Sequence, residues 1–497
     1  MALDDEEHVM ATAAPPPPAA AWRDGKRYLW LIGLVVPSLA FVGYLGHAVT
    51  GWSWWLWLGP IIILGVIPAI DLVVGRDRTN PPEEAVKALE ADPYYRWIVY
   101  AYIPIQYLGF VAAMYLIARG NPLPAIAGAL GSTSWLDALP GALGAPFELT
   151  TAERIGAAIS IGCIGGIAIN TAHELGHNRP KHERWLSKVA LAQSGYGHFF
   201  IEHNRGHHVR VATPEDPASS RLGESFYAFW PRTVVGSLRS AWRLEATRLR
   251  RRGKPVLHPG NDVLNAWAMT LVLWGALVLW LGIGVLPYLL LQGFIGLSLL
   301  EVVNYLEHYG MRRTKVHHGE VERYERVLQS HSWNSNNIAT NVFLYHLQRH
   351  SDHHANPTRR YQALRDHESA PVLPTGYAGM IVLALLPPLW RRVMDPRVAA
   401  HYDGDLSRAN IDPRKRERIL AAGAATAGAP LADELVLTAP DDVTTATCPG
   451  CGYRYVVAAG DEHEGFAAGT AWSEVPVDFA CPDCGVRDKL DFVLESV

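Results

Sequence analysis

Six long apolar stretches constrain this chain more than any other feature of its sequence. They cover residues 28–49, 54–74, 97–118, 155–172, 263–281 and 286–305. A helix needs about 20 mostly apolar residues to cross the hydrocarbon core of a bilayer, and each stretch is close to that length. The fourth is the shortest and is rich in Gly and Ala, which suits close helix packing. The sequence therefore predicts an all-α membrane protein built on a six-transmembrane-helix bundle.

The charges between these stretches predict how the bundle is oriented. Lys and Arg are frequent after the second, fourth and sixth stretches, and the first and fifth loops have none. Basic loops stay on the cytoplasmic side, so we expect a multi-pass protein of the bacterial cytoplasmic (inner) membrane, surrounded by lipid, with both termini inside. The net charge of −4 gives no basic footprint for nucleic acid. Whether the protein forms a homo-oligomer stays open.

Nine histidines gather in four clusters at the cytoplasmic end of this bundle. The clusters are HELGH (His173, His177), HNRGHH (His203, His207, His208), NYLEH (His308) and HSDHH (His350, His353, His354). Histidines four residues apart share one face of a helix. On that basis His203 pairs with His207 and His350 with His354, and the remaining histidine of each cluster can reach a second metal. Nine neutral imidazoles can hold two metal ions with positions left open for dioxygen.

Three other interpretations of the clusters compete with this one. HELGH alone matches the helical motif of zinc proteases, with Glu174 as general base, but nine histidines are too many for one tetrahedral zinc. A metal sensor or transporter should carry ionisable residues deep inside several spans, and few occur beyond Asp71 and Glu301. Ordinary surface histidines would not repeat this spacing.

Carboxylates near the clusters are candidates for orienting the histidines. A metal-bound imidazole usually donates its other N–H to a carboxylate or carbonyl. The candidates are Glu174, Glu202, Glu307, Asp352 and Asp71. Asp71 lies near the inner end of the second apolar stretch, where a solvated carboxylate at the membrane interface is an equal alternative.

Four of the five cysteines form two CxxC pairs near the C-terminus, Cys448 with Cys451 and Cys481 with Cys484. Paired CxxC motifs indicate a metal site in a reducing compartment. Cys163 stands alone in an apolar stretch and is expected in the core. An imidazole site and a thiolate site in one chain favour a redox-active metal centre supplied by an electron carrier.

Longer motifs extend the argument from ligands to a family. NPPEE (80–84), ATPEDPASSR (212–221), NYLEHYG (304–310) and LQRHSDHHANPTRRYQ (347–362) resemble the membrane alkane 1-monooxygenase family. The resemblance covers about residues 25–395 and implies a non-haem di-iron centre held by the nine histidines. It also implies hydroxylation of the terminal carbon of linear alkanes from the bilayer, with O2 as co-substrate and electrons from rubredoxin. A fatty-acid desaturase or another hydroxylase of the same di-iron group is the nearest alternative.

The C-terminal tail resembles rubredoxin, because CPGCGYRY followed by CPDCG matches its two iron-binding knuckles. A zinc ribbon uses the same four ligands, but Tyr453, Tyr455 and Trp472 favour iron. The resemblance makes the tail the electron donor, with Cys451 and Cys484 as its more exposed ligands. We expect basic segments 179–184 and 311–315 to meet Asp483 and Asp488.

These interpretations divide the chain into four parts. We expect a disordered N-terminal arm at 1–25, a transmembrane di-iron domain at 26–394, a linker at 395–443 and a small β-rich rubredoxin domain at 444–497. No G-x-G-x-x-G motif follows a predicted strand, so a separate NAD(P)H-dependent rubredoxin reductase is expected.

Overall fold

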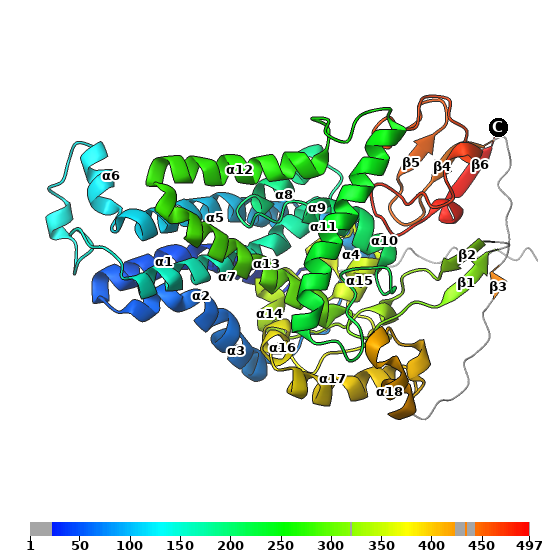
Figure 1. Cartoon of the computed structure of the whole chain (residues 1–497), viewed down its shortest axis with the longest axis horizontal. Helices are drawn as coiled ribbons and strands as arrows, with labels where there is room; N and C mark the ends of the chain where they lie inside the picture. Colours follow the sequence, from blue (N-terminus) through cyan, green and yellow to red (C-terminus); the bar gives the residue numbers. More distant parts are fainter. Residues whose placement is uncertain (1–21, 319–320, 423–432, 435–442, 497) are drawn as a thin grey trace, which may run out of the picture.

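The computed structural model describes residues 22–318, 321–422, 433–434 and 443–496. Within these residues, six helical segments are long and apolar enough to cross a membrane. They are Leu29–Thr50, Ser53–Val74, Pro93–Arg119, Thr151–Gly176, Asp262–Leu281 and Ile283–Glu307. In Figure 1 they run along the long axis, with α6 (Leu123–Ala129) beyond one end and the C-terminal module beyond the other. The six predicted spans are confirmed as helices.

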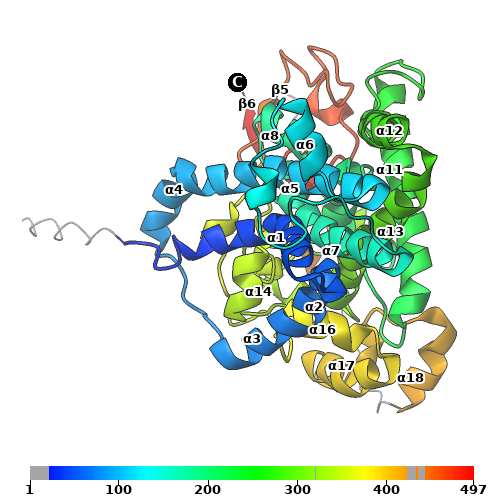
Figure 2. The same cartoon turned by 90° about the vertical axis from the view of Figure 1, so that its left-hand side faces the viewer.

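Helix α7 (Thr151–Gly176), the Gly- and Ala-rich span, lies at the centre of the bundle. It contacts α1 (Val35–Thr50), α2 (Leu58–Ile61), α5 (Pro93–Arg119) and α13 (Leu286–Glu307), as Figure 2 shows from the end that carries α6. Of the 18 residues in its most apolar stretch, 78% are buried, against 17% of the corresponding stretch in Asp262–Leu281. Small residues explain this position, because they let helix backbones approach closely.

Two glycines of α7 show how close this approach is. A Cβ atom on Gly162 would lie 2.7 Å from the backbone oxygen of Gln292 in α13. One on Gly166 would lie 2.8 Å from Leu299 Cβ in the same helix. The helix begins at a capping box, in which Thr150 Oγ1 accepts from Glu153 N and Glu153 accepts from Thr150 N. The sequence thus fixes both the start and the tight packing of the helix that ends in HELGH.

Of the other helices, α3 (Ile67–Val74) and α12 (Asp262–Leu281) belong to the second and fifth spans, and the rest form a layer at the histidine end of the bundle or link the spans. Besides α6, the rest are α4 (Glu83–Ala91), α8 (Lys181–Leu191), α9 (Phe199–Glu202), α10 (His208–Arg210), α11 (Phe226–Arg251), α14 (Ile338–Phe343), α15 (His350–Ala355), α16 (Tyr377–Ala384), α17 (Pro387–His401) and α18 (Arg416–Ala422). Short 3-10 helices cover Leu29–Leu34, Ser53–Trp57, Leu136–Ala138, Ile283–Val285, Gln329–His331, Tyr361–Ala363, Leu406–Arg408, Pro413–Lys415, Trp472–Glu474 and Lys489–Asp491. Within the described part of the chain, two π-helical turns lie at Ile62–Val66 and His203–His207.

Two small sheets complete the described chain. In the C-terminal module β4 (Val443–Thr447) lies between β5 (Arg454–Val456) and β6 (Val493–Ser496), and both pairs are antiparallel. Tyr455, Trp472 and Phe492 pack beneath this sheet. A second sheet has the order β2-β1-β3, from Val321–Tyr324, Lys315–His318 and Asp433–Glu434. The β-rich tail agrees with the predicted fold class.

The edges of the expected domains differ in detail from the described structure. Asp24, placed in the N-terminal arm, accepts hydrogen bonds from Trp30 and Tyr95. Helix α17 runs through the expected boundary at residue 394, because Trp390, Met394 and Val398 are buried in one apolar cluster. The rest of that arm (1–21) and linker residues 423–432 and 435–442 lie outside the described residues.

Candidate metal centres

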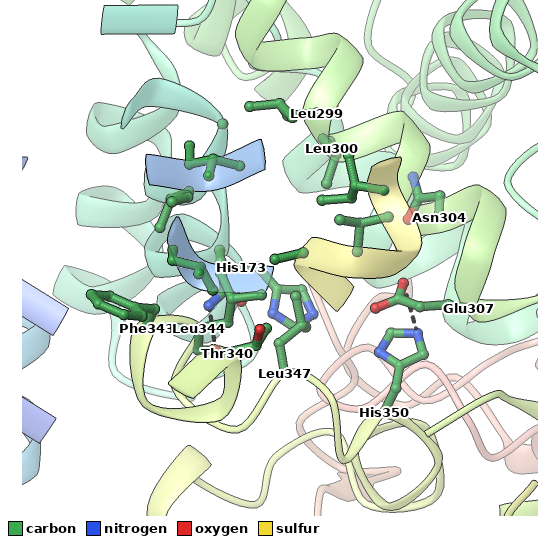
Figure 3. Close-up of a pocket in the computed structure, with 18 of the residues that line it drawn as sticks. His173, Leu299, Leu300, Asn304, Glu307, Thr340, Phe343, Leu344, Leu347 and His350 are labelled. Carbon is green, nitrogen blue, oxygen red and sulfur yellow. Dashed lines mark hydrogen bonds and ion pairs between the residues drawn. The ribbon is translucent and has the colours of Figure 1, made fainter. Parts of the chain in front are cut away.

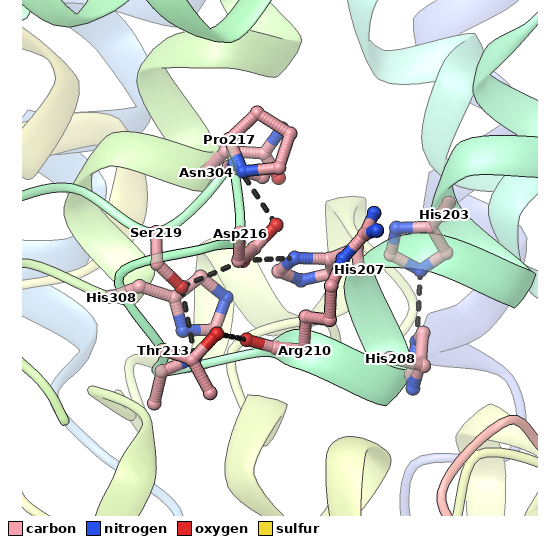
Figure 4. A network of polar contacts seen from close by, with 12 residues as sticks. His203, His207, His208, Arg210, Thr213, Asp216, Pro217, Ser219, Asn304 and His308 are labelled. Carbon is pink, nitrogen blue, oxygen red and sulfur yellow. Dashed lines mark hydrogen bonds and ion pairs between the residues drawn. The ribbon is translucent and has the colours of Figure 1, made fainter. Parts of the chain in front are cut away.

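The nine predicted histidines come together in two buried groups. One group holds His173, His177, His203, His208 and His353, and the other holds His207, His308, His350 and His354. Within each group, one ring nitrogen from every residue lies within 4.8 Å of the others. Figure 4 shows members of both groups, with His203 and His208 on one side and His207 and His308 on the other. The sequence clusters therefore converge from α7, α13, α15 and the His203–His207 turn.

A π-helical turn determines which histidines of HNRGHH belong to each group. Because its hydrogen bonds join residues five apart, His203 Nε2 faces His208 Nε2 at 3.0 Å. His207 faces the other group, with its Nε2 3.3 Å from His354 Nε2. The expected pairing of His203 with His207 is thus wrong, since it assumed an α-helical turn. The expected pairing of His350 with His354 is confirmed, at 2.9 Å between their Nε2 atoms.

The geometry of both groups fits metal ions. Metal–nitrogen bonds of about 2.1 Å place neighbouring ligand nitrogens about 3.0–3.4 Å apart, and His350 Nε2 lies 3.2 Å from His308 Nε2. Nε2 of His173, His177 and His353 is buried without a hydrogen-bond partner among the described residues. A buried polar atom of this kind is costly unless something binds it.

Burial also disfavours the charged form of several of these imidazoles. It lowers the pKa of His208, His353 and His354 well below the ordinary value, and the neighbouring histidines lower it further. A neutral imidazole keeps the lone pair that a metal ion needs. Burial of these three imidazoles therefore favours the form that can bind a metal ion.

Asp216, which sequence reasoning did not single out, supports one of the candidate ligands. Its Oδ2 lies 2.9 Å from His207 Nδ1 and accepts a hydrogen bond from Ser219 Oγ. Figure 4 shows Asp216 beside the His207 ring, on the side opposite His203 and His208. Burial alone would raise the pKa of Asp216, but His207 and the hydrogen bonds hold it below its ordinary value. The sequence signal that could have pointed to Asp216 was its place within the motif ATPEDPASSR.

Glu307 occupies a different place from the one predicted for it. Its Oε2 lies 3.2 Å from His350 Nε2, the nitrogen that faces the other histidines of its group. Figure 3 shows this contact at the edge of a pocket. Glu307 was expected to orient a histidine from behind, but it points to the side where a metal would bind. Its buried Oε1 has no hydrogen-bond partner among the described residues.

Among the described residues, none of the other four predicted carboxylates makes a hydrogen bond or ion pair with a candidate ligand. Asp71 accepts from the backbone and hydroxyl of Thr340 in α14, and Glu174 accepts from Tyr361 N. Glu202 pairs with Arg210. Asp352 binds Arg359 and His367. Since α14 and residues around Tyr361 flank the histidines, these carboxylates fix the surrounding chain rather than the ligand rings.

An apolar pocket leads to both histidine groups. Its walls come from the second span, α7, α13, α14 and α16, and they include Ile63, Ile67, Ile167, Leu299, Leu300, Val303, Phe343, Leu344, Leu347 and Ile381. At one end lie His173, His350 and Glu307, as Figure 3 shows. The mostly apolar lining fits a substrate without polar groups.

The four tail cysteines form a third candidate site. Cys448 Sγ lies 3.7 Å from Cys484 Sγ, and Cys451 Sγ lies 3.6 Å from Cys481 Sγ. Four thiolates around a metal with bonds of about 2.3 Å lie about 3.8 Å apart. The sulfur spacing therefore fits a tetrahedral metal site.

This module docks directly on the layer that carries the histidines. Gly485 packs on the His203–His207 turn, where its Cβ would lie 2.4 Å from Asn204 O and 3.4 Å from His208 Cβ. Ion pairs surround the contact and join Arg179 and Arg184 to Asp483, Arg205 to Glu464, and Arg323 to Asp488 and Asp491. The predicted meeting of segment 179–184 with Asp483 is found. Asp488 instead meets Arg323, in β2, rather than segment 311–315.

Comparisons with known proteins agree with these sites. The fatty acid desaturase family model matches residues 154–384, and the rubredoxin model matches residues 445–492. Alkane 1-monooxygenase from Acinetobacter baylyi is 46% identical, over 80% of this chain and 91% of its own length. Alkane 1-monooxygenase 1 from Alcanivorax borkumensis is 42% identical over 79% of this chain and 90% of its own. The enzyme from Ectopseudomonas oleovorans is 42% identical over 80% and 92%.

Identity at this level, over nearly the whole length of each relative, accompanies the features already described: the membrane spans, the converging histidines, the apolar pocket and the thiolate module. These features support alkane hydroxylation by a multi-pass membrane protein with an iron-containing electron-transfer module. The chain belongs to the alkane 1-monooxygenase family and carries a rubredoxin domain at its C-terminus.

Proposed function

We propose that this chain hydroxylates the terminal carbon of linear alkanes to 1-alkanols, with electrons delivered by its own rubredoxin domain. The observation that carries the proposal is the apolar pocket that ends at His173, His350 and Glu307. One turnover consumes the alkane, O2, two electrons and two protons, and it yields the alkanol and water. The substrate offers no polar group, so its orientation must come from the shape of the pocket.

The nine histidines would hold two iron ions, one in each group. Glu307 is an additional oxygen ligand candidate for the group that contains His350, because it faces the same side. Asp216 accepts from His207 Nδ1 and so directs Nε2 of that ring toward the site. When bound, the irons supply the dioxygen and redox chemistry of the reaction.

The side chains of the pocket provide selectivity for the end of the alkane. Apolar residues from α13 and α14 make up most of the lining beside the substrate and would exclude water from it. A narrow channel admits an alkane end first, so its terminal carbon arrives beside His173 and His350. The alkane is expected to enter from the surrounding bilayer.

Electrons would pass from the four thiolates to the histidine groups across the contact of Gly485 with Asn204. Each electron originates from NAD(P)H through a separate reductase. The spans would lie in the cytoplasmic membrane, with both termini and all three metal sites inside, since the basic loops lie at that end.

A single-turnover experiment tests the proposal. The purified, reduced protein is mixed with O2 and a series of linear alkanes, and the products are identified. We expect only 1-alkanols, with about three irons per chain from two ligand sets of different softness. Replacing His207 or His353 by Ala should abolish the product but keep the colour of the rubredoxin iron. Zinc in the histidine groups of fully active protein would contradict the iron assignment.

Removing residues 444–497 tests the route of the electrons. NAD(P)H-driven turnover with the reductase should stop, and added free rubredoxin should restore it only at high concentration, because a tether raises the local concentration of donor. Full turnover of the shortened chain without any rubredoxin would show that the tail is not the donor.

A further inference from the structure

The two cysteine knuckles of the rubredoxin domain differ in their exposure. In the second knuckle Cys481, Cys484 and Gly485 are buried, and Gly485 packs on the His203–His207 turn. In the first knuckle Pro449, Gly450 and Gly452 are exposed, and Cys451 is half-buried. The resemblance to rubredoxin predicts Cys451 and Cys484 as the more exposed ligands; Cys451 is half-buried, but Cys484 is buried next to the Gly485 contact. The thiolate site is therefore covered at the second knuckle, and its edge at the first knuckle is open to solvent.

The open knuckle borders a cleft whose far wall is α4. Gly450 lines this cleft with Glu83, Glu84, Lys87 and Arg359. Glu83 pairs with Arg365, whereas Glu84 is exposed and makes no hydrogen bond or ion pair among the described residues. Exposed acidic residues thus stand beside the open edge of the metal site.

We propose that the electron-donating reductase docks on this first knuckle, against α4, while the rubredoxin domain stays in place on the histidine layer. Electrons would enter at the Cys451 edge and leave at the Cys484–Gly485 edge, so the domain need not detach between reduction and delivery. This inference rests on the proposed function, in which the tail is the electron donor.

The chemistry of the step defines the partner. NAD(P)H releases two electrons together as a hydride, whereas a single thiolate-bound iron accepts one at a time. The partner must therefore hold a group that takes the hydride and releases single electrons, which a flavin does. Each NAD(P)H reduces the thiolate iron twice and releases one proton. Basic side chains around the partner's flavin edge would complement Glu83 and Glu84.

Two variants of the full-length protein test where the reductase docks. Pro449→Trp places an indole on the first knuckle, and Glu84→Lys reverses an exposed charge on α4. Glu417→Lys is the matched control, because Glu417 is an exposed carboxylate of α18 that makes no hydrogen bond or ion pair among the described residues. The reductase and NADH are mixed without oxygen, and loss of the iron(III)–thiolate colour gives the rate. The unchanged starting spectrum shows that the iron site is intact.

We expect Pro449→Trp to slow reduction by about tenfold or more, as for a residue at the centre of an interface. Glu84→Lys should slow it about threefold at low salt, since an exposed rim charge acts mainly on the association rate. Glu417→Lys should leave the rate unchanged. Normal reduction of the Pro449→Trp and Glu84→Lys proteins would place electron entry elsewhere and overturn the proposal.

A third variant tests whether the domain must detach. Arg184→Glu removes the Arg184–Asp483 ion pair of 2.8 Å and weakens docking. If reduction occurs on the docked domain, this variant keeps its rate of reduction but transfers electrons to the histidine groups more slowly. Faster reduction of the Arg184→Glu protein would mean that detachment limits the step, and the proposal would be wrong.

The proposed function can fail while the proposed docking face of the reductase still holds. If reduction of the thiolate iron depends on Pro449 but no electron then reaches the histidine groups, the docking face stands and the tail is not the donor.

Discussion

Gly485 of the second cysteine knuckle packs against the backbone oxygen of Asn204, which lies between His203 and His207. A Cβ atom on Gly485 would lie 2.4 Å from that oxygen. Gly485 also has a φ of +68°, which other residues rarely adopt. This contact between the rubredoxin domain and the histidine layer thus depends on a residue without a side chain.

Replacing Gly485 by Ala should therefore separate the two domains. The new Cβ meets a backbone atom that cannot move aside, so electron transfer from the thiolate iron to the histidine groups should slow markedly. A positive φ costs a non-glycine residue about 1–2 kcal/mol. Gly469→Ala is the matched control, because Gly469 has a φ of +86° and no described atom lies within 4 Å of its added Cβ. Equal slowing in both variants would mean that backbone strain, and not the contact, is responsible.

The Arg184–Asp483 ion pair should contribute modestly to docking. Its side chains are 29% and 20% exposed, and pairs of this kind contribute up to about 1 kcal/mol. Asp483→Arg should slow internal electron transfer at low salt, and the effect should shrink at high salt. Combining it with Arg184→Asp should restore part of the rate. A rate in the double variant no better than in Asp483→Arg alone would argue against a direct pair.

Asp216→Asn should weaken metal binding in the four-histidine group. The carboxylate accepts from His207 Nδ1 at 2.9 Å, and loss of such a partner typically lowers metal affinity about 10- to 100-fold. Iron content and competition with a chelator measure the change, and the iron of the rubredoxin domain serves as an internal reference. Ser219→Ala, which removes only a hydrogen bond to Asp216, should give a smaller loss. Unchanged affinity in Asp216→Asn would show that the contact does not support the metal.

Gly162→Ala should destabilise the bundle much more than Gly165→Ala. At Gly162 the added Cβ would lie 2.7 Å from Gln292 O, whereas at Gly165 the nearest atom of another residue would lie 3.8 Å away. Overpacking of this kind costs about 1–3 kcal/mol. Thermal unfolding in detergent measures the difference, and equal midpoints would contradict the tight α7–α13 contact.

Much of the bundle and most of the site were predictable because their signals are local. Each span is marked by its own apolar length, and each histidine cluster by its own spacing. His350 and His354 illustrate this, since four residues of an α-helix bring their Nε2 atoms to 2.9 Å. The cysteine knuckles are equally local, because each CxxC loop shapes its own half of the site.

The features that sequence reasoning missed depend on register or on distant contacts. A π turn and an α turn differ by one residue, and nothing local in HNRGHH distinguished them. Asp216 meets His207 only because the loop after α10 folds back beneath the ring. The partner of Asp488 was misplaced for the same reason, since Arg323 reaches it from β2. Docking geometry of this kind is a property of the folded chain as a whole.

The orientation of the bundle gives a last prediction. Residues 120–153, which include α6, contain no Lys or Arg, whereas the histidine end carries the basic loops, so the former should face outward. A cysteine at Ser134, an exposed position of this loop, should react in intact cells with a maleimide that does not cross membranes. A cysteine at Glu417 in α18 should react only after the cells are permeabilised. The reverse pattern would place the rubredoxin domain outside, away from cytoplasmic NAD(P)H, and would contradict the proposed electron route as well as the topology.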